Sequence, residues 1–549
     1  MSRPLNDSYD YVVVGSGFGG SVSALRLAEK GYKVLVVEKG NWYNETALPG
    51  TTWKLRKWLW NPGLGWRGIM KLSFFRHVTV MSGVGVGGGS LVYGATLPTP
   101  KPHFFESGSW AGLANWKDTL KPHYDTALRM LGAVVNKQVS PADRVMKSLA
   151  VDLGKPDSYG PSRVGIYFGD STRAGRLVDD PYFDGEGPAR RGCIECGECM
   201  TGCRHNAKNS LDKNYLYLAQ KLGVDIRAES EVVDILPVGA PDGSQGYIVT
   251  VKCGRGILRR KKQFLHAGAV VLAGGVTGTV PLLLEMKDRQ RLPRISDRLG
   301  HDIRTNNEAL AAVTSLESDD IDYTQGVCIG SIVNVDKDSH LEAIHMGKRS
   351  GTWRFLMWPY VSGRTFWARA RNMVKELIRS PLANLKVMFT RNWGERTVYL
   401  LFMQHLDSTL QLRRGSFGRI VSHIPLAHQN NAPSCDMPIV DDLVRRVEKI
   451  MGGKASRGNT EIALGAPTTA HILGGAVMGE SEDTGVVDRQ GRVFNYSNLF
   501  ICDGSMVSAN PGVNPSLSIT AISEYIMDGI PACEAIDDEG STAMMAAQG

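Results

Sequence analysis

Four cysteines lie close together near the middle of the chain and could offer thiolates to a metal. Their spacing, C-x2-C-x2-C-x3-C, is that of a bacterial ferredoxin run, although Arg204 stands where such runs carry a proline and no second run follows. The pattern predicts an iron–sulfur cluster, with Cys328 as a further candidate ligand, or a zinc ion bound by four thiolates, or thiols that bind no metal. The four residues are Cys193, Cys196, Cys199 and Cys203.

A glycine-rich turn near the N-terminus has the residues of a dinucleotide site. Gly15, Gly17 and Gly20 form a GxGxxG pattern between a predicted apolar strand and a predicted helix. The first glycine permits the tight turn, the second lets the backbone approach a pyrophosphate, and the third lets helix and strand pack closely. The helix N-terminus then offers free N–H groups to the phosphates. The predicted contacts in this turn are Gly15, Gly17, Phe18, Gly19 and Gly20.

An acidic residue follows this turn at the expected distance. Glu38 ends the next predicted strand, where a carboxylate accepts hydrogen bonds from ribose hydroxyls. Its negative charge disfavours the 2′-phosphate of NADP, but this unit alone leaves both NAD and FAD open.

A second glycine-rich loop over residues 83–90 is too rich in glycine for a packed element, which predicts that its backbone lies against another part of a large cofactor. Further motifs follow in order, SLDKNYL at 210–216, HILGG at 471–475, DGS at 503–505 and GVNP at 512–515. With these motifs the chain resembles the glucose–methanol–choline (GMC) flavoprotein oxidoreductases, in their bacterial cholesterol-oxidase-like branch. The resemblance runs from residue 8 to residue 530.

The resemblance implies an FAD cofactor whose isoalloxazine lies between the second glycine loop and the C-terminal motifs. In such proteins the position of Val232 contacts the adenine, and the positions of Asn514 and Pro515 lie near the reacting edge of the flavin. The implied FAD contacts beyond the first turn and Glu38 are Gly83, Gly88, Gly89, Ser90, Val92, Tyr93, Val232, Asp503, Gly504, Asn514 and Pro515.

The implied fold is α/β, with a Rossmann-like FAD-binding domain and a second, α+β substrate-binding domain built on an antiparallel sheet. A chain of 549 residues is also too long for one core, which independently favours two domains. The discontinuous FAD-binding domain is expected to comprise 8–100, 191–300 and 464–531, and the substrate-binding domain 101–190 and 301–463, with 532–549 as a disordered tail.

The resemblance also implies the catalytic residues. His471 and Asn514 match the catalytic histidine and asparagine of the family, and a histidine with a pKa near 6.5 suits the task of accepting a hydroxyl proton. The implied reaction transfers a hydride from the carbon of a secondary alcohol to flavin N5. The alcohol belongs to a sterol or a similarly bulky lipid. Glu342 lies in the region of the carboxylate base that shifts a double bond in sterol oxidases, and Glu308 is its rival.

The sequence is also compatible with two other functions. An iron–sulfur flavoprotein alcohol dehydrogenase that acts on a non-sterol alcohol would pass its electrons to a carrier, whereas an enzyme without a cluster would use oxygen. A dinucleotide-binding or membrane-associated protein without catalysis would bind the cofactor but turn nothing over.

Tryptophans interleaved with arginine and lysine predict contact with a membrane interface, where rings lie at the headgroups and cations meet anionic lipid. A protein–protein interface or a packed insertion is the alternative. The two groups are Trp53, Trp58, Trp60 and Trp66, and Trp353, Trp358, Trp367 and Trp393.

Composition narrows the remaining classes. The net charge of +8 is too small and too dispersed for a nucleic-acid stripe. The polar N-terminus has no apolar signal core, and no long uncharged run lacks glycine and proline, so we expect a cytoplasmic protein that at most contacts the membrane peripherally.

Overall fold

The computed structural model describes residues 7–169, 174–256, 260–317, 321–426, 429 and 432–534. A βαβ unit begins it, made of β1 (Asp7–Val14), α1 (Phe18–Glu29) and β2 (Val34–Val37). All four residues of β2 are buried, because parallel strands are covered on both faces. β1 pairs in parallel with β2, which confirms the predicted Rossmann-like start.

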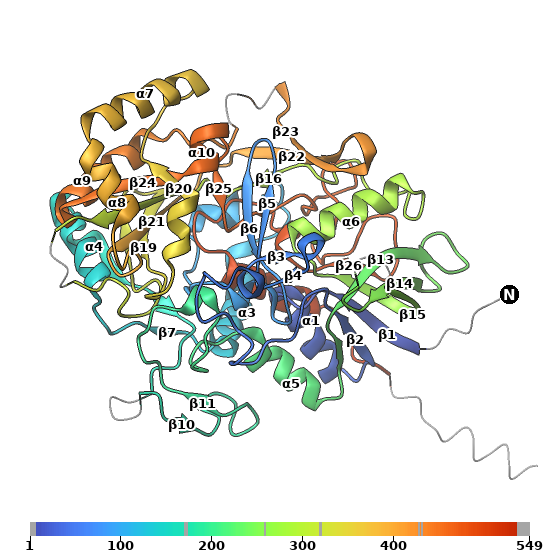
Figure 1. The fold of residues 1–549 in the computed structure, drawn as a ribbon. Coiled ribbons are helices and arrows are strands. Elements are labelled where there is room, and N and C mark those ends of the chain that lie inside the picture. Colours follow the sequence, from blue (N-terminus) through green and yellow to red (C-terminus); the bar gives the residue numbers. More distant parts are fainter. Residues whose placement is uncertain are drawn as a thin grey trace, which may run out of the picture.

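The first large sheet is built from segments far apart in the chain, and in Figure 1 it lies on the right. α1, α3 (Trp116–Met130), α5 (Tyr215–Lys221) and α11 (Ser516–Asp528) pack together beside it. Its strand order is β12 (Asp225–Arg227), β2, β1, β15 (Lys261–Leu272), β14 (Tyr247–Cys253) and β13 (Ser230–Pro237), with β26 (Leu499–Ile501) also paired to β15.

The second large sheet lies on the left of Figure 1, and every pairing within it is antiparallel. α4 (Pro141–Asp152) and α9 (Pro438–Met451) cover one of its faces. Its order is β20 (Met357–Pro359), β24 (Gly453–Gly458), β17 (Ala309–Ser315), β21 (Thr397–Gln404), β19 (Ser339–Ile344), β18 (Ser331–Asn334) and β8 (Tyr159–Pro161).

Side chains alternate between the two faces of this second sheet, as they must in a strand. Along β17, Ala311 and Val313 join the core beneath α4 and α9, whereas Leu310 and Ala312 join a different apolar cluster. The sheet therefore has a packed face and a second apolar face available to line a site.

Smaller elements complete the fold. β5 (Met70–Phe74), β6 (Thr79–Gly83) and β25 (Thr468–Thr469) form one three-stranded sheet in the centre of Figure 1. The chain also forms α2 (Leu55–Trp58), α6 (Val276–Asp288), α7 (Phe366–Arg379), α8 (Pro381–Phe389) and α10 (Asn459–Leu464), and a sheet of β16 (Ile303–Arg304), β22 (Thr409–Arg414) and β23 (Ile420–His423). Three two-stranded ribbons join β3 (Trp60–Asn61) to β4 (Trp66–Arg67), β7 (Val134–Val135) to β9 (Arg163–Val164) and β10 (Leu177–Val178) to β11 (Arg190–Arg191).

Two predictions about the periphery need correction. Trp58, Trp353 and Trp393 are buried in the apolar cluster that contains Leu310, so they pack inside the protein and cannot meet a membrane. The start of the predicted disordered tail is ordered, because Cys533 N donates to Lys30 O at 2.8 Å. Residues 535–549 lie outside the described residues. No helix in the described ranges is both long and apolar enough to cross a bilayer.

Candidate active site

A single cavity of about 870 Å³ connects the N-terminal glycine turn with the C-terminal motifs. Gly15 and Gly17 line it together with His471 and Asn514, although more than 450 residues separate the turn from these side chains. The two residues predicted to be catalytic therefore face the same space as the predicted dinucleotide turn.

The glycine turn is shaped to receive a ligand. A Cβ on Gly17 would meet no protein atom within 4 Å, so this backbone faces open space. The N-terminus of α1 has no side-chain cap, which leaves its N–H groups available to an anionic group. Gly88 has φ +51°, and a Cβ there would lie 2.7 Å from the Gly17 Cα, so the two glycine loops can approach only without side chains. These residues fit the pyrophosphate of a dinucleotide such as FAD.

Glu38 lies on the wall of the cavity and is buried. Its Oε2 accepts a hydrogen bond from Ser16 Oγ at 2.8 Å, and its Oε1 accepts one from Gly40 N at 2.8 Å. These bonds hold the carboxylate in place, while its contact with ribose hydroxyls stays a prediction.

Nearly all the predicted cofactor residues line the cavity, and the two exceptions support it from behind. Ser90 Oγ donates to Gly87 O at 2.6 Å and accepts from Leu211 N at 3.0 Å, so it stabilises the second loop. A Cβ on Gly20 would lie 2.1 Å from Gly15 O, which is the close packing of helix and turn that the sequence predicts. The lining residues are Gly15, Gly17, Phe18, Gly19, Glu38, Gly83, Gly88, Gly89, Val92, Tyr93, Val232, Asp503, Gly504, Asn514 and Pro515.

Asp503 makes its hydrogen bonds to protein groups. Its Oδ2 accepts from Gly275 N at 2.8 Å and from Thr279 Oγ1 at 2.5 Å, and its Oδ1 accepts from Ser505 N at 2.8 Å. Burial raises the pKa of Asp503 despite these bonds. The side chain thus joins α6 to the C-terminal motif at the cavity wall.

His471 is held by the carboxylate of Glu308, for which the sequence predicts no such contact. Glu308 Oε1 bonds to His471 Nδ1, and Glu308 Oε2 accepts from Ala470 N at 2.9 Å. Burial lowers the pKa of His471, but the Glu308 carboxylate, helped by that of Glu342, outweighs it, so the pKa is raised above its usual value of 6.5. Because Nδ1 is engaged, Nε2 is the atom left to act on a ligand.

Asn514 is oriented by a second carboxylate. Its Nδ2 donates to Glu342 Oε2 at 3.2 Å, and its Oδ1 is buried without a hydrogen-bond partner among the described residues. Glu342 is itself fully buried on β19 and does not line the cavity, and His340 Nε2 lies 3.5 Å from its Oε1. Each predicted catalytic side chain therefore has its own buried carboxylate, Glu308 for His471 and Glu342 for Asn514.

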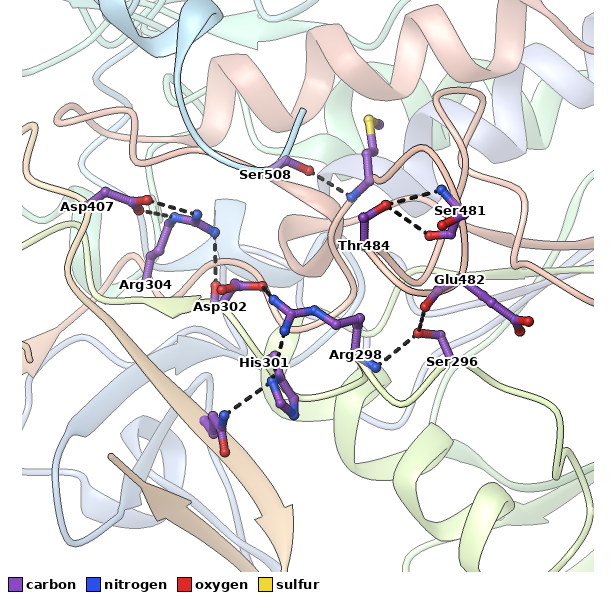
Figure 2. A network of polar contacts seen from close by, with 12 residues as sticks. Ser296, Arg298, His301, Asp302, Arg304, Asp407, Ser481, Glu482, Thr484 and Ser508 are labelled. Atoms are coloured by element: carbon purple, nitrogen blue, oxygen red, sulfur yellow. Dashed lines mark hydrogen bonds and ion pairs between the residues drawn. The ribbon is translucent and has the colours of Figure 1, made fainter. Parts of the chain in front are cut away.

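The segment that follows His471 is braced by a polar network, which Figure 2 shows. The backbone of Arg304 pairs with Leu473, and its buried guanidinium binds Asp407 at 2.5 Å and Asp302 O at 3.0 Å. Gly474 has φ +76°, and a Cβ there would lie 2.1 Å from Asp302 O. This contact explains the first glycine of the HILGG motif, since no other residue allows the approach.

The apolar wall of the cavity was not predicted from the sequence. Three of its residues, Leu310, Ile344 and Leu401, come from the central strands β17, β19 and β21 of the second sheet. Alternating apolar residues mark a buried strand but do not reveal which of its two faces borders a cavity. The remaining apolar and sulfur-bearing residues of this wall are Met70, Met81, Met200, Ile329 and Met346.

The four cysteines of the central run do not form one compact thiolate site. Cys199 is buried together with Cys328 in an apolar cluster. Among the described residues, the one set of three or more candidate ligands with atoms within 4.8 Å of one another is Cys196, Glu198 and His205. Tetrahedral zinc needs four sulfurs roughly 4 Å apart, a set that the described residues do not show. The zinc ion and the iron–sulfur cluster both stay predictions.

Comparisons with known proteins agree with this geometry. Models of the GMC oxidoreductase family match residues 189–288 and 439–523, and a model of an NAD(P)-binding Rossmann-like domain matches residues 13–45. A cholesterol oxidase of Acinetobacter baumannii is 39% identical over 544 residues, which cover 98% of this chain and 97% of that protein. A cholesterol oxidase of Mycobacterium tuberculosis is 41% identical over 531 residues, which cover 95% of this chain and 90% of that protein.

A solved structure shares the fold at low sequence identity. The crystal structure of pyridoxine 4-oxidase from Mesorbium loti superposes with a TM-score of 0.58 at 15% identity, covering 94% of this chain and 98% of that one. The family models, the two relatives and the shared fold agree with one another. The chain belongs to the GMC oxidoreductase family, and it is an oxidoreductase of that family.

Proposed function

We propose that the protein uses FAD to oxidise the secondary alcohol of a sterol or a similarly bulky lipid. The observation that carries this proposal is one cavity lined by the dinucleotide turn, by His471 and Asn514, and by the apolar wall of the second sheet. An apolar wall of this size suits a large hydrocarbon substrate with a single polar group. The names of the two bacterial relatives support the same substrate class.

The polar residues of the cavity divide the work on the hydroxyl group. His471 Nε2 accepts the hydroxyl proton, and Glu308 steadies the imidazolium that results. Asn514 Nδ2 can share a hydrogen bond with the substrate oxygen, because Glu342 holds its amide toward the cavity. When bound, FAD supplies the acceptor for the hydride, and the protein's own contribution is to orient the carbinol C–H.

The charge of Glu308 predicts how activity depends on pH. A protonated imidazole cannot accept a proton, so kcat/KM is expected to fall as the pH drops through the raised pKa of His471. Glu308→Gln removes the charge that raises this pKa, so the acid limb of the profile should move to lower pH while kcat falls on the order of tenfold to a hundredfold. An acid limb at the same pH in wild type and variant would contradict the role given to Glu308.

A double-bond shift after oxidation is the second step that we propose, with Glu342 as its base. The carboxylate lies directly behind Asn514, which lines the cavity. Its Oε1 makes no hydrogen bond to the described residues, with His340 Nε2 3.5 Å away, so this oxygen can take up a proton. Glu342→Gln keeps an oxygen that can accept from Asn514, so oxidation should continue while the unshifted ketone accumulates about 100-fold over wild type. The matched variant Glu308→Gln should slow oxidation and leave the ratio of the two ketones unchanged. Rapid isomerisation by Glu342→Gln would show that Glu342 is not the base of this step.

The substrate class is tested by product analysis. The purified protein is incubated in air with cholesterol, with a long-chain primary alcohol and with a small diol, and the carbonyl products are identified by mass spectrometry. The proposal expects the sterol ketone as the main product. Turnover of the small diol alone would overturn it. An iron assay on the same preparation and a comparison of oxygen with an artificial electron acceptor test the iron–sulfur dehydrogenase alternative.

A further inference from the structure

Helices α7 and α8 turn apolar side chains outward. On α7, Trp367, Val374 and Ile378 are 79%, 56% and 76% exposed and lie on one side, at spacings of seven and four residues. On α8, no residue is buried, and Leu382 and Phe389 are 73% and 77% exposed. A surface helix of a soluble domain usually buries its apolar side, so this arrangement is the reverse of the ordinary one.

The polar side of α7 is the side that faces the protein. Arg369 is buried, and its Nε donates to Ile462 O at 2.7 Å on α10. Glu376, the one acidic residue of both helices, pairs with Lys454 of β24 at 2.7 Å. The helix is thus fixed by polar anchors, and the outward direction of its apolar residues follows from them.

Exposed cations accompany the apolar residues. None of these cations forms an ion pair with another residue in the described part of the chain, so their charges are available to a binding partner. They are Arg371, Lys375, Arg379 and Lys386.

We propose that α7 and α8 dock on a lipid bilayer that contains anionic phospholipid. An amphipathic helix that lies in the interface buries its apolar side among the acyl chains and keeps its cations at the headgroups. On α7, Lys375 and Arg379 flank the apolar side, and Arg371, four residues after Trp367, has a side chain long enough to extend past it to the headgroups. This inference rests on the proposed function, since a lipid substrate must be taken from a membrane.

The same helices are connected to the catalytic segment. α10, which receives the Arg369 anchor, ends at Leu464, and Thr468 four residues later already lines the cavity. His471 follows three residues after Thr468. A surface anchored to α10 is therefore joined by a short piece of chain to the site that would receive the lipid.

Charge argues against a second copy of this chain as the occupant. Five basic residues and one acidic residue lie within 366–389, so two such surfaces placed face to face would repel each other. An anionic bilayer complements the same charges, because its headgroups attract cations that lie near the surface.

The experiment is co-sedimentation of the FAD-loaded full chain with vesicles of phosphatidylcholine, with and without phosphatidylglycerol. We expect binding to the anionic vesicles at least tenfold tighter than to the neutral ones. The double variant Trp367→Ser/Ile378→Ser should lose at least tenfold in affinity for the anionic vesicles. Arg371→Glu/Lys375→Glu should lose the preference for anionic lipid. The matched control Val151→Ser/Leu222→Ser, which changes apolar residues that are 60% and 53% exposed and lie outside α7 and α8, should bind like wild type.

Three results would overturn the docking proposal. The first is no binding of wild type to anionic vesicles, and the second is equal binding of wild type and Trp367→Ser/Ile378→Ser. The third is a wild type that is a dimer without lipid and a double variant that is a monomer. The surface would then be an interface between two copies of the chain.

Activity on cyclodextrin-solubilised sterol separates this proposal from the proposed function. The docking variants should oxidise soluble sterol like wild type and lose activity on sterol in vesicles. If wild type binds vesicles as expected but oxidises sterol in neither form, the proposed function fails and the docking surface stands.

Discussion

His471→Gln is expected to lower kcat/KM by about 10³-fold, within the range that a lost general base causes. The variant loses the Nε2 atom that accepts the hydroxyl proton, whereas Glu308 and Asn514 remain in place. Steady-state oxidation of a sterol at saturating oxygen measures the change. Because the glutamine amide can still donate a hydrogen bond to the buried Glu308 carboxylate, FAD content and melting temperature should stay near those of wild type.

The control for this variant is His103→Gln, which removes an exposed imidazole that does not line the cavity. It should keep wild-type activity. If His471→Gln also keeps most of its activity with full FAD content, another group accepts the proton and the assignment of His471 is wrong.

Gly17→Val is expected to give a folded protein that lacks its flavin. The backbone of Gly17 has φ −72° and ψ −165°, which valine adopts readily, and a Cβ there meets no protein atom within 4 Å. The added side chain would occupy only the space that a pyrophosphate needs. We expect at least about tenfold weaker FAD binding, or about 1.4 kcal/mol, with activity lost in proportion.

Gly160→Val is the matched control, because a Cβ on this β8 glycine also meets nothing within 4 Å but lies away from the cavity lining. Flavin absorbance per protein and circular dichroism separate the two variants. Full flavin content in Gly17→Val would show that the turn does not contact the cofactor.

Local patterns explain which parts of the site could be predicted from the sequence. The turn with Gly15 and Gly17 depends on backbone geometry within a few residues, so its role can be derived without the rest of the fold. The density of glycine in the second loop predicts a backbone that lies against the cofactor, but it does not predict the close approach of Gly88 to Gly17.

Long-range contacts explain what could not be predicted. Glu308 and His471 are 163 residues apart, and the carboxylate lies beside the imidazole because the distant segments that hold them are joined by the backbone pairing of Arg304 with Leu473. For the same reason the sequence does not distinguish buried from exposed tryptophans. Trp353 and Trp367 lie in one basic stretch, yet Trp353 is buried and Trp367 is 79% exposed. Burial of a side chain is decided by the packing of whole elements, which composition alone does not contain.

The most direct test of the central claim is anaerobic reduction of the flavin by a sterol deuterated at its carbinol carbon. The purified FAD-loaded protein is mixed with the labelled or the unlabelled sterol in a stopped-flow instrument, and the flavin absorbance is followed. If the carbinol C–H is transferred within the cavity of His471 and Asn514, the absorbance bleaches, and it bleaches several-fold more slowly with deuterium. A flavin that is fully bound and stays oxidised with every sterol would contradict the account.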